Sequence, residues 1–223
     1  MIIAVQGEAQ MRIGIKQGLN LSTISYSPWF DQYQYYIKFD YKKAYCGGLV
    51  FQYFSEKKLG IQAELLYSQK GFITSYDTIR NTQYKRSINY ISMPLLMHFY
   101  FLKKNASPFL LLGVFGSIAL NSNEVYIDDH SITKTNSYLF DRNKDNRGEY
   151  GHDLGFGFRR IFPFGTLQAQ GEFNYSFGSL YKWGTRSDNT ALNNYFRIPE
   201  VAQNQTITIS LIYLFDIKKE TFK

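Results

Sequence analysis

Residues 167–177 read LQAQGEFNYSF, and apolar residues or Gly alternate with polar residues along the whole stretch. Leu167 and Phe173 belong to the apolar series, whereas Gln168 and Glu172 belong to the polar series. A period of two residues predicts a β-strand with one face in water and the other face out of it. A soluble sheet turns its polar face outward and a membrane barrel turns it inward, so the rest of the chain has to decide between the two arrangements.

Seven further segments alternate in the same way. Together the eight predicted strands are Arg12–Ser22, Ala44–Phe54, Leu59–Lys70, Ile88–Phe101, Pro108–Leu120, Tyr150–Arg160, 167–177 and Asn204–Phe215. Each has about 10–14 residues, which is longer than the usual ~5–6 residues of a soluble strand and close to the ~9–11 tilted residues that cross a bilayer.

The connections between these strands alternate between short and long. The short ones are 55–58, 103–107 and 162–165, and the long ones are 23–43, 71–87, 121–149 and 177–203. Outer-membrane barrels have short periplasmic turns and long external loops, and an even number of strands returns both chain ends to the periplasmic side. The pattern therefore predicts an all-β fold, an eight-stranded antiparallel up-and-down transmembrane β-barrel in the bacterial outer membrane.

The composition decides which face meets the lipid. The chain has 223 residues with 19 Tyr and 19 Phe, and the apolar face carries most of the large side chains. An eight-stranded barrel has an interior just wide enough for side chains to fill, so these large side chains have to point outward. The polar face is rich in Gly, Ser and Thr, which fit a narrow lumen.

The large polar residues of the inward face carry both signs of charge. By strand parity, the predicted lumen network is Lys16, Glu64, Lys70, His98, Asp153, Arg159 and Glu172. A structural plug of ion pairs is the main interpretation, because a buried unpaired charge is costly. A narrow small-solute channel, as in a porin-like protein, is the alternative.

Other protein classes fit the sequence less well. A soluble lipocalin-like barrel shares the alternation, but it usually has a helix and a disulfide, and this chain has a single Cys46. The net charge of +7 is scattered along the chain, whereas nucleic-acid binding needs it clustered, so we expect no nucleic-acid partner. No stretch reaches the ~18 apolar residues of a transmembrane helix.

The first nine residues resemble the end of a secretory signal peptide. Gly7-Glu8-Ala9 before Gln10 has the small-x-small pattern of a signal-peptidase site, although a basic region is missing. We expect residues 1–9 to be a signal-peptide remnant whose start lies upstream, with residues 10–223 forming one barrel domain; a disordered terminus is the alternative.

Several stretches resemble the PorT-like outer-membrane β-barrel family of Bacteroidota. They are GIKQGLNLST (14–23), ELLYSQKG (64–71), INYISMPLLMHFYF (88–101), the Gly113/Gly116 strand, HDLGFGF (152–158) and TISLIYLF (208–215). The resemblance implies an eight-stranded outer-membrane barrel in contact with membrane lipid and lipopolysaccharide. Phe215, the aromatic residue that ends the last predicted strand, resembles the signal read by the barrel-assembly machinery, although residues 216–223 extend beyond it. The family name comes from a component of type IX secretion and gliding, and most relatives have no assigned role.

The long loops hold the candidate contact residues. In loop 23–43, aromatic residues continue the outward parity of the next strand, which predicts a strand starting near Tyr33 and standing above the membrane. Such a ribbon adds a partner's strand at its edge or stacks on sugar rings, although a self-packed hairpin is the alternative. The candidate contacts are Trp29, Phe30, Tyr33, Tyr35 and Trp183.

Metal binding and catalysis have weaker support in the sequence. Asp141, Asn143 and Asp145 have the spacing of calcium ligands, but Asn146 and His152 stand where an EF-hand needs Gly and Glu, so an Asx-rich turn is favoured. Of the three histidines, His152 is the most plausible for a lipid hydrolase, yet no nucleophile motif accompanies it. We therefore expect no cofactor and no enzymatic activity.

The predicted function is that of a non-enzymatic outer-membrane barrel whose external loops bind a partner or a surface ligand. The first alternative is an accessory subunit of a larger envelope complex, such as a type IX secretion or nutrient-uptake assembly. The second is the narrow channel described above.

Overall fold

The computed structural model describes residues 10–26, 37–54, 58–76, 82–102, 105–128, 131–143, 145–182 and 202–217. These residues form nine strands: β1 (Gln10–Tyr26), β2 (Ile37–Phe54), β3 (Leu59–Tyr76), β4 (Thr82–Tyr100), β5 (Ala106–Asp128), β6 (Ser131–Tyr138), β7 (Gly148–Phe162), β8 (Gly165–Ser179) and β9 (Ala202–Ile217). Within the described ranges, no helix is long and apolar enough to cross a membrane.

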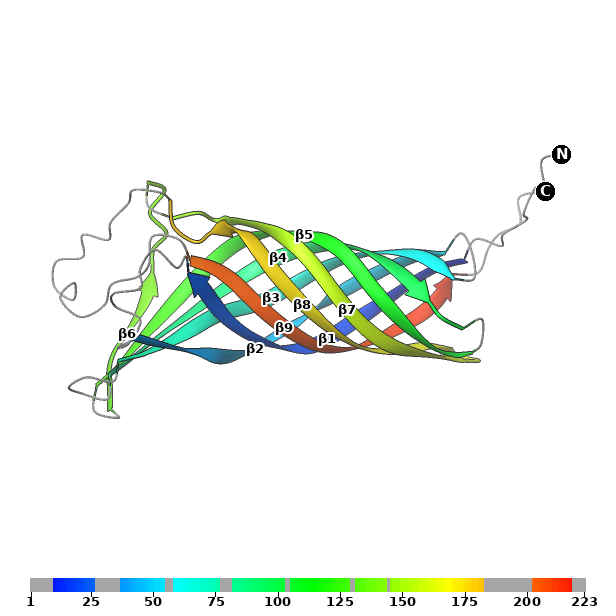
Figure 1. The fold of residues 1–223 in the computed structure, drawn as a ribbon, viewed down its shortest axis with the longest axis horizontal. Helices are drawn as coiled ribbons and strands as arrows, with labels where there is room; N and C mark the ends of the chain where they lie inside the picture. The colour runs from blue at the N-terminus through cyan, green and yellow to red at the C-terminus, as the bar shows by residue number, and fades with distance from the viewer. Residues whose placement is uncertain are drawn as a thin grey trace.

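Eight of the strands close into a barrel of tilted antiparallel strands (Figure 1). The hydrogen-bonded order is β4-β3-β2-β1-β9-β8-β7-β5, and β5 also pairs with β4, which closes the ring. Met11 near the start of β1 lies opposite Ile217 at the end of β9, so the first and last strands are neighbours. The all-β, up-and-down, eight-stranded barrel predicted from the sequence is confirmed.

The alternation along each strand divides the side chains between the outer surface and the lumen. Large apolar side chains form an outward belt, hereafter the lipid belt, which includes Ile15, Leu49, Phe51, Leu95, Val114, Phe156 and Ile209. Aromatic residues lie toward its two ends, among them Tyr45, Tyr67 and Phe177 at the long-loop end and Phe99, Phe158 and Phe215 at the short-turn end. Belts of this kind, edged with aromatic rings, are typical of membrane barrels.

Several strands continue beyond the lipid belt at the long-loop end. β3 runs to Tyr76 and β4 begins at Thr82, although the sequence predicted a loop over residues 71–87. β2 begins at Ile37, and the predicted start near Tyr33 lies outside the described residues. Strand pairing satisfies the backbone donors and acceptors of this extension, which is why the ladder does not stop at the membrane surface.

The expectation that residues 121–149 form one long loop is wrong in part. β5 continues to Asp128, and β6 folds back on it as a hairpin, with Ser122 opposite Tyr138. Exposed and buried side chains of β5 keep alternating from Asn121 to Glu124, so the strand geometry persists outside the membrane although these residues are all polar. β6 is the one described strand that is not part of the eight-stranded ring, and within the described residues it pairs only with β5.

Candidate functional site

A buried ion-pair triad occupies the middle of the lumen. Lys16 Nζ on β1 donates to Glu64 Oε2 on β3 at 2.8 Å and to Glu172 Oε1 on β8 at 2.7 Å. All three side chains are almost completely buried. Gln170 Nε2 also donates to Glu172 at 2.7 Å. The ammonium group therefore has two carboxylate partners, as a buried charge requires.

A chain of glutamine side chains extends this network around the lumen. Gln62 donates to Glu64, Gln52 donates to Gln62, and Gln52 Nε2 also donates to Gln168 at 3.0 Å. Gln168 in turn donates to the Tyr100 hydroxyl at 3.1 Å. The bonds link β3, β2, β8 and β4, so amide groups connect walls of the barrel that are not neighbours in the ring.

Stacked rings fill the lumen near the short-turn end. The His98 ring stacks on Tyr100 and Phe109, with centroid separations of 5.6 and 5.1 Å. The Arg159 guanidinium lies 3.6 Å from the centroid of the Tyr100 ring, a cation–π contact. Phe54, Tyr100, Phe109 and Leu111 form one apolar cluster at this level. This end of the lumen is thus occupied by side chains.

A second ion pair lies toward the long-loop end. Lys70 Nζ on β3 donates to Glu149 Oε1 on β7 at 3.0 Å, and both side chains are buried. The same ammonium lies 4.6 Å from the centre of the Phe115 ring. Asp153 is also buried here, although neither of its carboxylate oxygens has a hydrogen-bond partner among the described residues.

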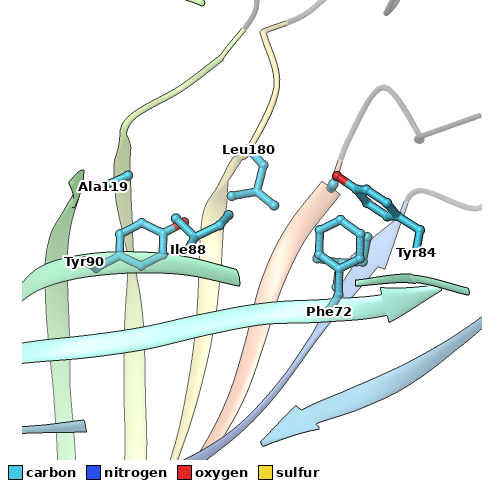
Figure 2. Packing of buried hydrophobic residues seen from close by; sticks show 8 residues of the cluster. Phe72, Tyr84, Ile88, Tyr90, Ala119 and Leu180 are labelled. Atoms are coloured by element: carbon cyan, nitrogen blue, oxygen red, sulfur yellow. The ribbon is translucent and has the colours of Figure 1, made fainter. Parts of the chain in front are cut away.

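An apolar cluster covers the polar lumen at the long-loop end (Figure 2). Its buried members are Ile24, Phe72, Tyr84, Ile88, Tyr90, Ala119, Leu180 and Ala202. They come from β1, β3, β4, β5 and β9 and from the residues just after β8. Ala119 lies between the outward-facing Ile118 and Leu120, so the cluster begins at the end of the lipid belt and continues beyond it with Phe72 and Tyr84.

The described residues between β6 and β7, 139–143 and 145–147, are hereafter called the strap, and they fold over this cluster. Asn146 N–H donates to Leu180 O at 3.0 Å, and Asp145 forms an isolated β-bridge with Tyr181. The Asp145 carboxylate accepts hydrogen bonds from the Tyr138 hydroxyl and the Asp141 N–H, each at 2.8 Å. These contacts hold the strap against the end of β8.

The apolar cluster and the strap together form the extracellular cap of the barrel. Arg86 is the charged residue at the centre of this cap. Its guanidinium lies 3.9 Å from the centre of the Tyr138 ring and donates to the Tyr181 hydroxyl. Tyr84 donates to Glu124 beside it. Burial raises the pKa of the Tyr84, Tyr138 and Tyr181 hydroxyls above the ordinary tyrosine value. No sequence motif indicated these contacts around Arg86. The alternation of the strands, continued beyond the membrane, could have assigned Arg86 and Glu124 to the inward face.

The predicted lumen residues and the predicted loop contacts have different outcomes in the structure. Buried in the barrel interior are Lys16, Glu64, Lys70, His98, Asp153, Arg159 and Glu172. The structure brings the first two together with Glu172, and it pairs Lys70 with Glu149, which the sequence analysis missed. The proposed loop contacts Trp29, Phe30, Tyr33, Tyr35 and Trp183 lie outside the described residues.

The structure shows the contacts of the residues considered for calcium binding and for catalysis. Asp141 Oδ1 accepts the Asn143 N–H at 2.8 Å, an Asx turn, and Asp145 uses its carboxylate within the strap. Among the described residues, no group of three or more His, Cys, Asp or Glu could hold a metal ion. His152 faces outward, stacks on Tyr175 at a centroid separation of 5.6 Å and makes a tilted ring contact with Phe177 at 5.1 Å. Its ring contacts are therefore those of an aromatic girdle residue.

Residues 6–182 match the family described as "Outer membrane protein beta-barrel domain". The chain belongs to this family. It is an outer-membrane β-barrel protein, located in the bacterial outer membrane, and its lipid belt contacts membrane lipids.

Solved structures of other outer-membrane proteins are similar to this barrel. OprG from Pseudomonas aeruginosa is 14% identical with a TM-score of 0.43, and the match covers 94% of this chain and 96% of that one. Ail, the attachment invasion locus protein of Yersinia pestis, in complex with the heparin analogue sucrose octasulfate, is 12% identical with a TM-score of 0.41, covering 92% and 99%. The outer-membrane protease OmpT from Escherichia coli is 9% identical with a TM-score of 0.40, covering 96% and 99%. The sequence has no match among curated proteins.

Proposed function

We propose that this barrel is a non-enzymatic surface protein that binds an extended segment of a partner protein along the edge of β2 that faces away from β3, above the membrane. The observation that carries this proposal is the end of the β1–β2 ladder. β1 pairs with β2 only as far as Ser22 opposite Lys42, whereas β2 continues outward with β3, from Tyr41 opposite Phe72 to Ile37 opposite Tyr76. Among the described residues, the strand pairing of Ile37–Tyr41 is therefore with β3 alone.

A partner's strand that lies along the edge of a sheet forms hydrogen bonds with the backbone N–H and C=O groups of that edge. The side chains of this edge suit a binding role, because Tyr41 is an exposed aromatic residue and Lys38 is an exposed cation. Trp29, Phe30, Tyr33 and Tyr35 precede this strand in the sequence, and we propose that they contact the same partner.

The filled lumen supports a binding role over a channel. Ion pairs, glutamines and stacked rings occupy its length, and the apolar cluster and strap lie across its long-loop end. We expect no conductance steps above leak when the purified protein is inserted into planar bilayers. Reproducible steps would instead favour the narrow small-solute channel.

An accessory role in an envelope complex, such as a type IX secretion or nutrient-uptake assembly, is the second candidate function. The resemblance to PorT-like barrels, carried by motifs such as ELLYSQKG (64–71) and HDLGFGF (152–158), supports the fold and the location of such a subunit. We also propose that the barrel-assembly machinery inserts the chain and that lipopolysaccharide surrounds its outer leaflet.

Pull-down of the full chain from detergent-solubilised outer membranes tests the proposal, with proline variants at two consecutive edge positions, Lys38→Pro and Phe39→Pro. Successive residues of a strand point their N–H groups to opposite sides, so one variant removes an N–H from the edge that faces away from β3 and the other removes one from the β2–β3 ladder. We expect the variant that loses the N–H facing away from β3 to lose a stoichiometric protein partner while it keeps heat-modifiable migration. Recovery of the same partner by both variants, or of no partner by the wild type, would overturn strand addition.

A further inference from the structure

A small cavity lies inside the barrel between the Lys16 triad and the Lys70–Glu149 pair. Its walls include Lys16, Lys70, Asp153, Glu172, Asn174 and Thr208. The space that the centre of a water-sized group can occupy is about 20 Å³. This is enough for one or two such groups. The cavity is therefore too small for an organic solute and large enough for an ion.

One carboxylate in this cavity wall has no partner. Asp153 is 1% exposed, and neither Oδ1 nor Oδ2 has a hydrogen-bond partner in the described part of the chain. Across the strands it faces Asn174, which lies opposite Thr206, whose hydroxyl is also without a partner. An isolated buried carboxylate is strongly unfavourable, so this group either binds a proton or has a positive partner in the cavity.

The buried side chains around the cavity carry more negative than positive charge. The ammonium groups are those of Lys16 and Lys70, and the carboxylates are those of Glu64, Glu172, Glu149 and Asp153. Lys16 is shared by two carboxylates and Lys70 is bound to a third, which leaves Asp153 without a cation of its own. Arg159 lies six residues along the same strand, roughly 20 Å away in an extended chain, over the Tyr100 ring.

The neutral groups of the wall supply further oxygen atoms. The Thr208 hydroxyl donates to Asn20 Oδ1 at 2.9 Å, which leaves its lone pairs free to act as acceptors, and it lies 3.4 Å from Asn174 Oδ1. Carboxylate, carbonyl and hydroxyl oxygens are the ligands that hard cations prefer. Within the described residues no three acidic, His or Cys side chains converge, so the donor set suits a singly charged ion better than a divalent one.

We propose that this cavity is a binding site for a small monovalent cation, with the Asp153 carboxylate as its charged ligand and Asn174 and Thr208 as neutral oxygen ligands. The site is distinct from the partner-binding edge of β2, because it lies inside the barrel. Its role is to neutralise the excess negative charge of the lumen and so to stabilise the barrel.

Thermal unfolding of the full chain in a non-ionic detergent, followed by circular dichroism, tests the site with Na⁺ as the probe. NaCl is compared with N-methyl-D-glucamine chloride at the same ionic strength and pH, because the organic cation is too large for the cavity. We expect Na⁺ to raise the wild-type midpoint by roughly 2–4 °C. Asp153→Asn should abolish this difference, whereas Asp141→Asn, in the exposed turn of the strap, should retain it.

Equal midpoints in the two salts, or a Na⁺ effect that survives in Asp153→Asn, would overturn the proposal. If the midpoint of thermal unfolding is the same in both salts and rises only as the pH falls, the neutralising charge is a proton. That result would also overturn the proposal. Should Asp153→Asn fail to fold, crystals of the wild type soaked in Tl⁺ decide the question. An anomalous peak beside the Asp153 carboxylate supports the site, and a clean map there refutes it.

Discussion

Lys16 on β1 and Glu172 on β8 form an ion pair inside the barrel, with 2.7 Å between Nζ and Oε1 and with side chains that are 0% and 3% exposed. Glu64 on β3 holds the same ammonium from the other side. In the ring, β3 and β8 are each two strands away from β1. The triad therefore ties together an arc of five strands through the lumen, in addition to the hydrogen bonds between neighbours.

Loss of the central ammonium should destabilise the barrel strongly. Lys16→Met leaves Glu64 and Glu172 buried without their cation, and breaking a buried ion pair in this way costs about 3–5 kcal/mol. Urea unfolding from lipid vesicles measures the loss. Lys38→Met is the matched control, because Lys38 is 77% exposed and lies 3.8 Å from Asp40, a surface pair worth ~0–1 kcal/mol. Equal losses in the two variants would contradict a structural role for the triad.

The direction of the apolar face can be tested by placing a charge on it. Val114 is 58% exposed in the lipid belt, so Val114→Arg puts a guanidinium into the bilayer at a cost of ~2–4 kcal/mol near the midplane. Leu139 is 87% exposed in the strap, above the belt, and Leu139→Arg should be nearly neutral. Folding yield into vesicles, read from heat-modifiable migration, compares the two variants. A harmless Val114→Arg would mean that this face is not in lipid.

The sequence was sufficient to predict the barrel because each strand obeys a period of two where it crosses the lipid belt. Parity alone assigns Lys16, Asp153 and Glu172 to the inside and Val114 to the outside. Which inward side chains meet across the lumen depends on the tilt and register of the strands, which parity does not encode. The pairing of Lys70 with Glu149, 79 positions apart, is a result of that register.

The extracellular cap was harder to predict for a different physical reason. Outside the membrane no lipid enforces the alternation, and polar residues occur on both faces of β5 and β6, so residues 121–149 read as a loop. The side chains that define the cap, such as Arg86 and Tyr181, come from segments 95 positions apart. Local pattern carries no information about such a contact.

Gly71 marks the point where β3 leaves the lipid belt, and it should not tolerate a side chain. Its φ is +149°, and a Cβ there would clash with the carbonyl oxygen of Arg86 on β4. Gly71→Ala should therefore cost about 1–3 kcal/mol in urea unfolding. Gly116→Ala is the control, because a Cβ on that residue meets nothing within 4 Å. A Gly71→Ala variant as stable as Gly116→Ala would contradict the strained backbone at Gly71.

Tyrosine ionisation should open the extracellular cap at alkaline pH. Burial raises the pKa of the Tyr84, Tyr138 and Tyr181 hydroxyls in the folded protein, whereas the same groups ionise near pH 10 in an unfolded chain. A raised folded-state pKa gives stability that is fully present below about pH 10 and is lost as the pH rises from there toward the folded-state value. The strap contacts made by Tyr138 and Tyr181 should therefore weaken only above about pH 10.

Absorbance of tyrosinate during an alkaline titration checks this expectation. Tyr138→Phe should remove amplitude from the step that lies above the ordinary tyrosine value, because that hydroxyl is held protonated against Asp145. The same variant should begin to lose protease resistance in the strap at lower denaturant concentration, since Asp145 then lacks one donor. If the missing amplitude came instead from the step near pH 10, Tyr138 would be solvated in solution and the strap would not be closed over the barrel.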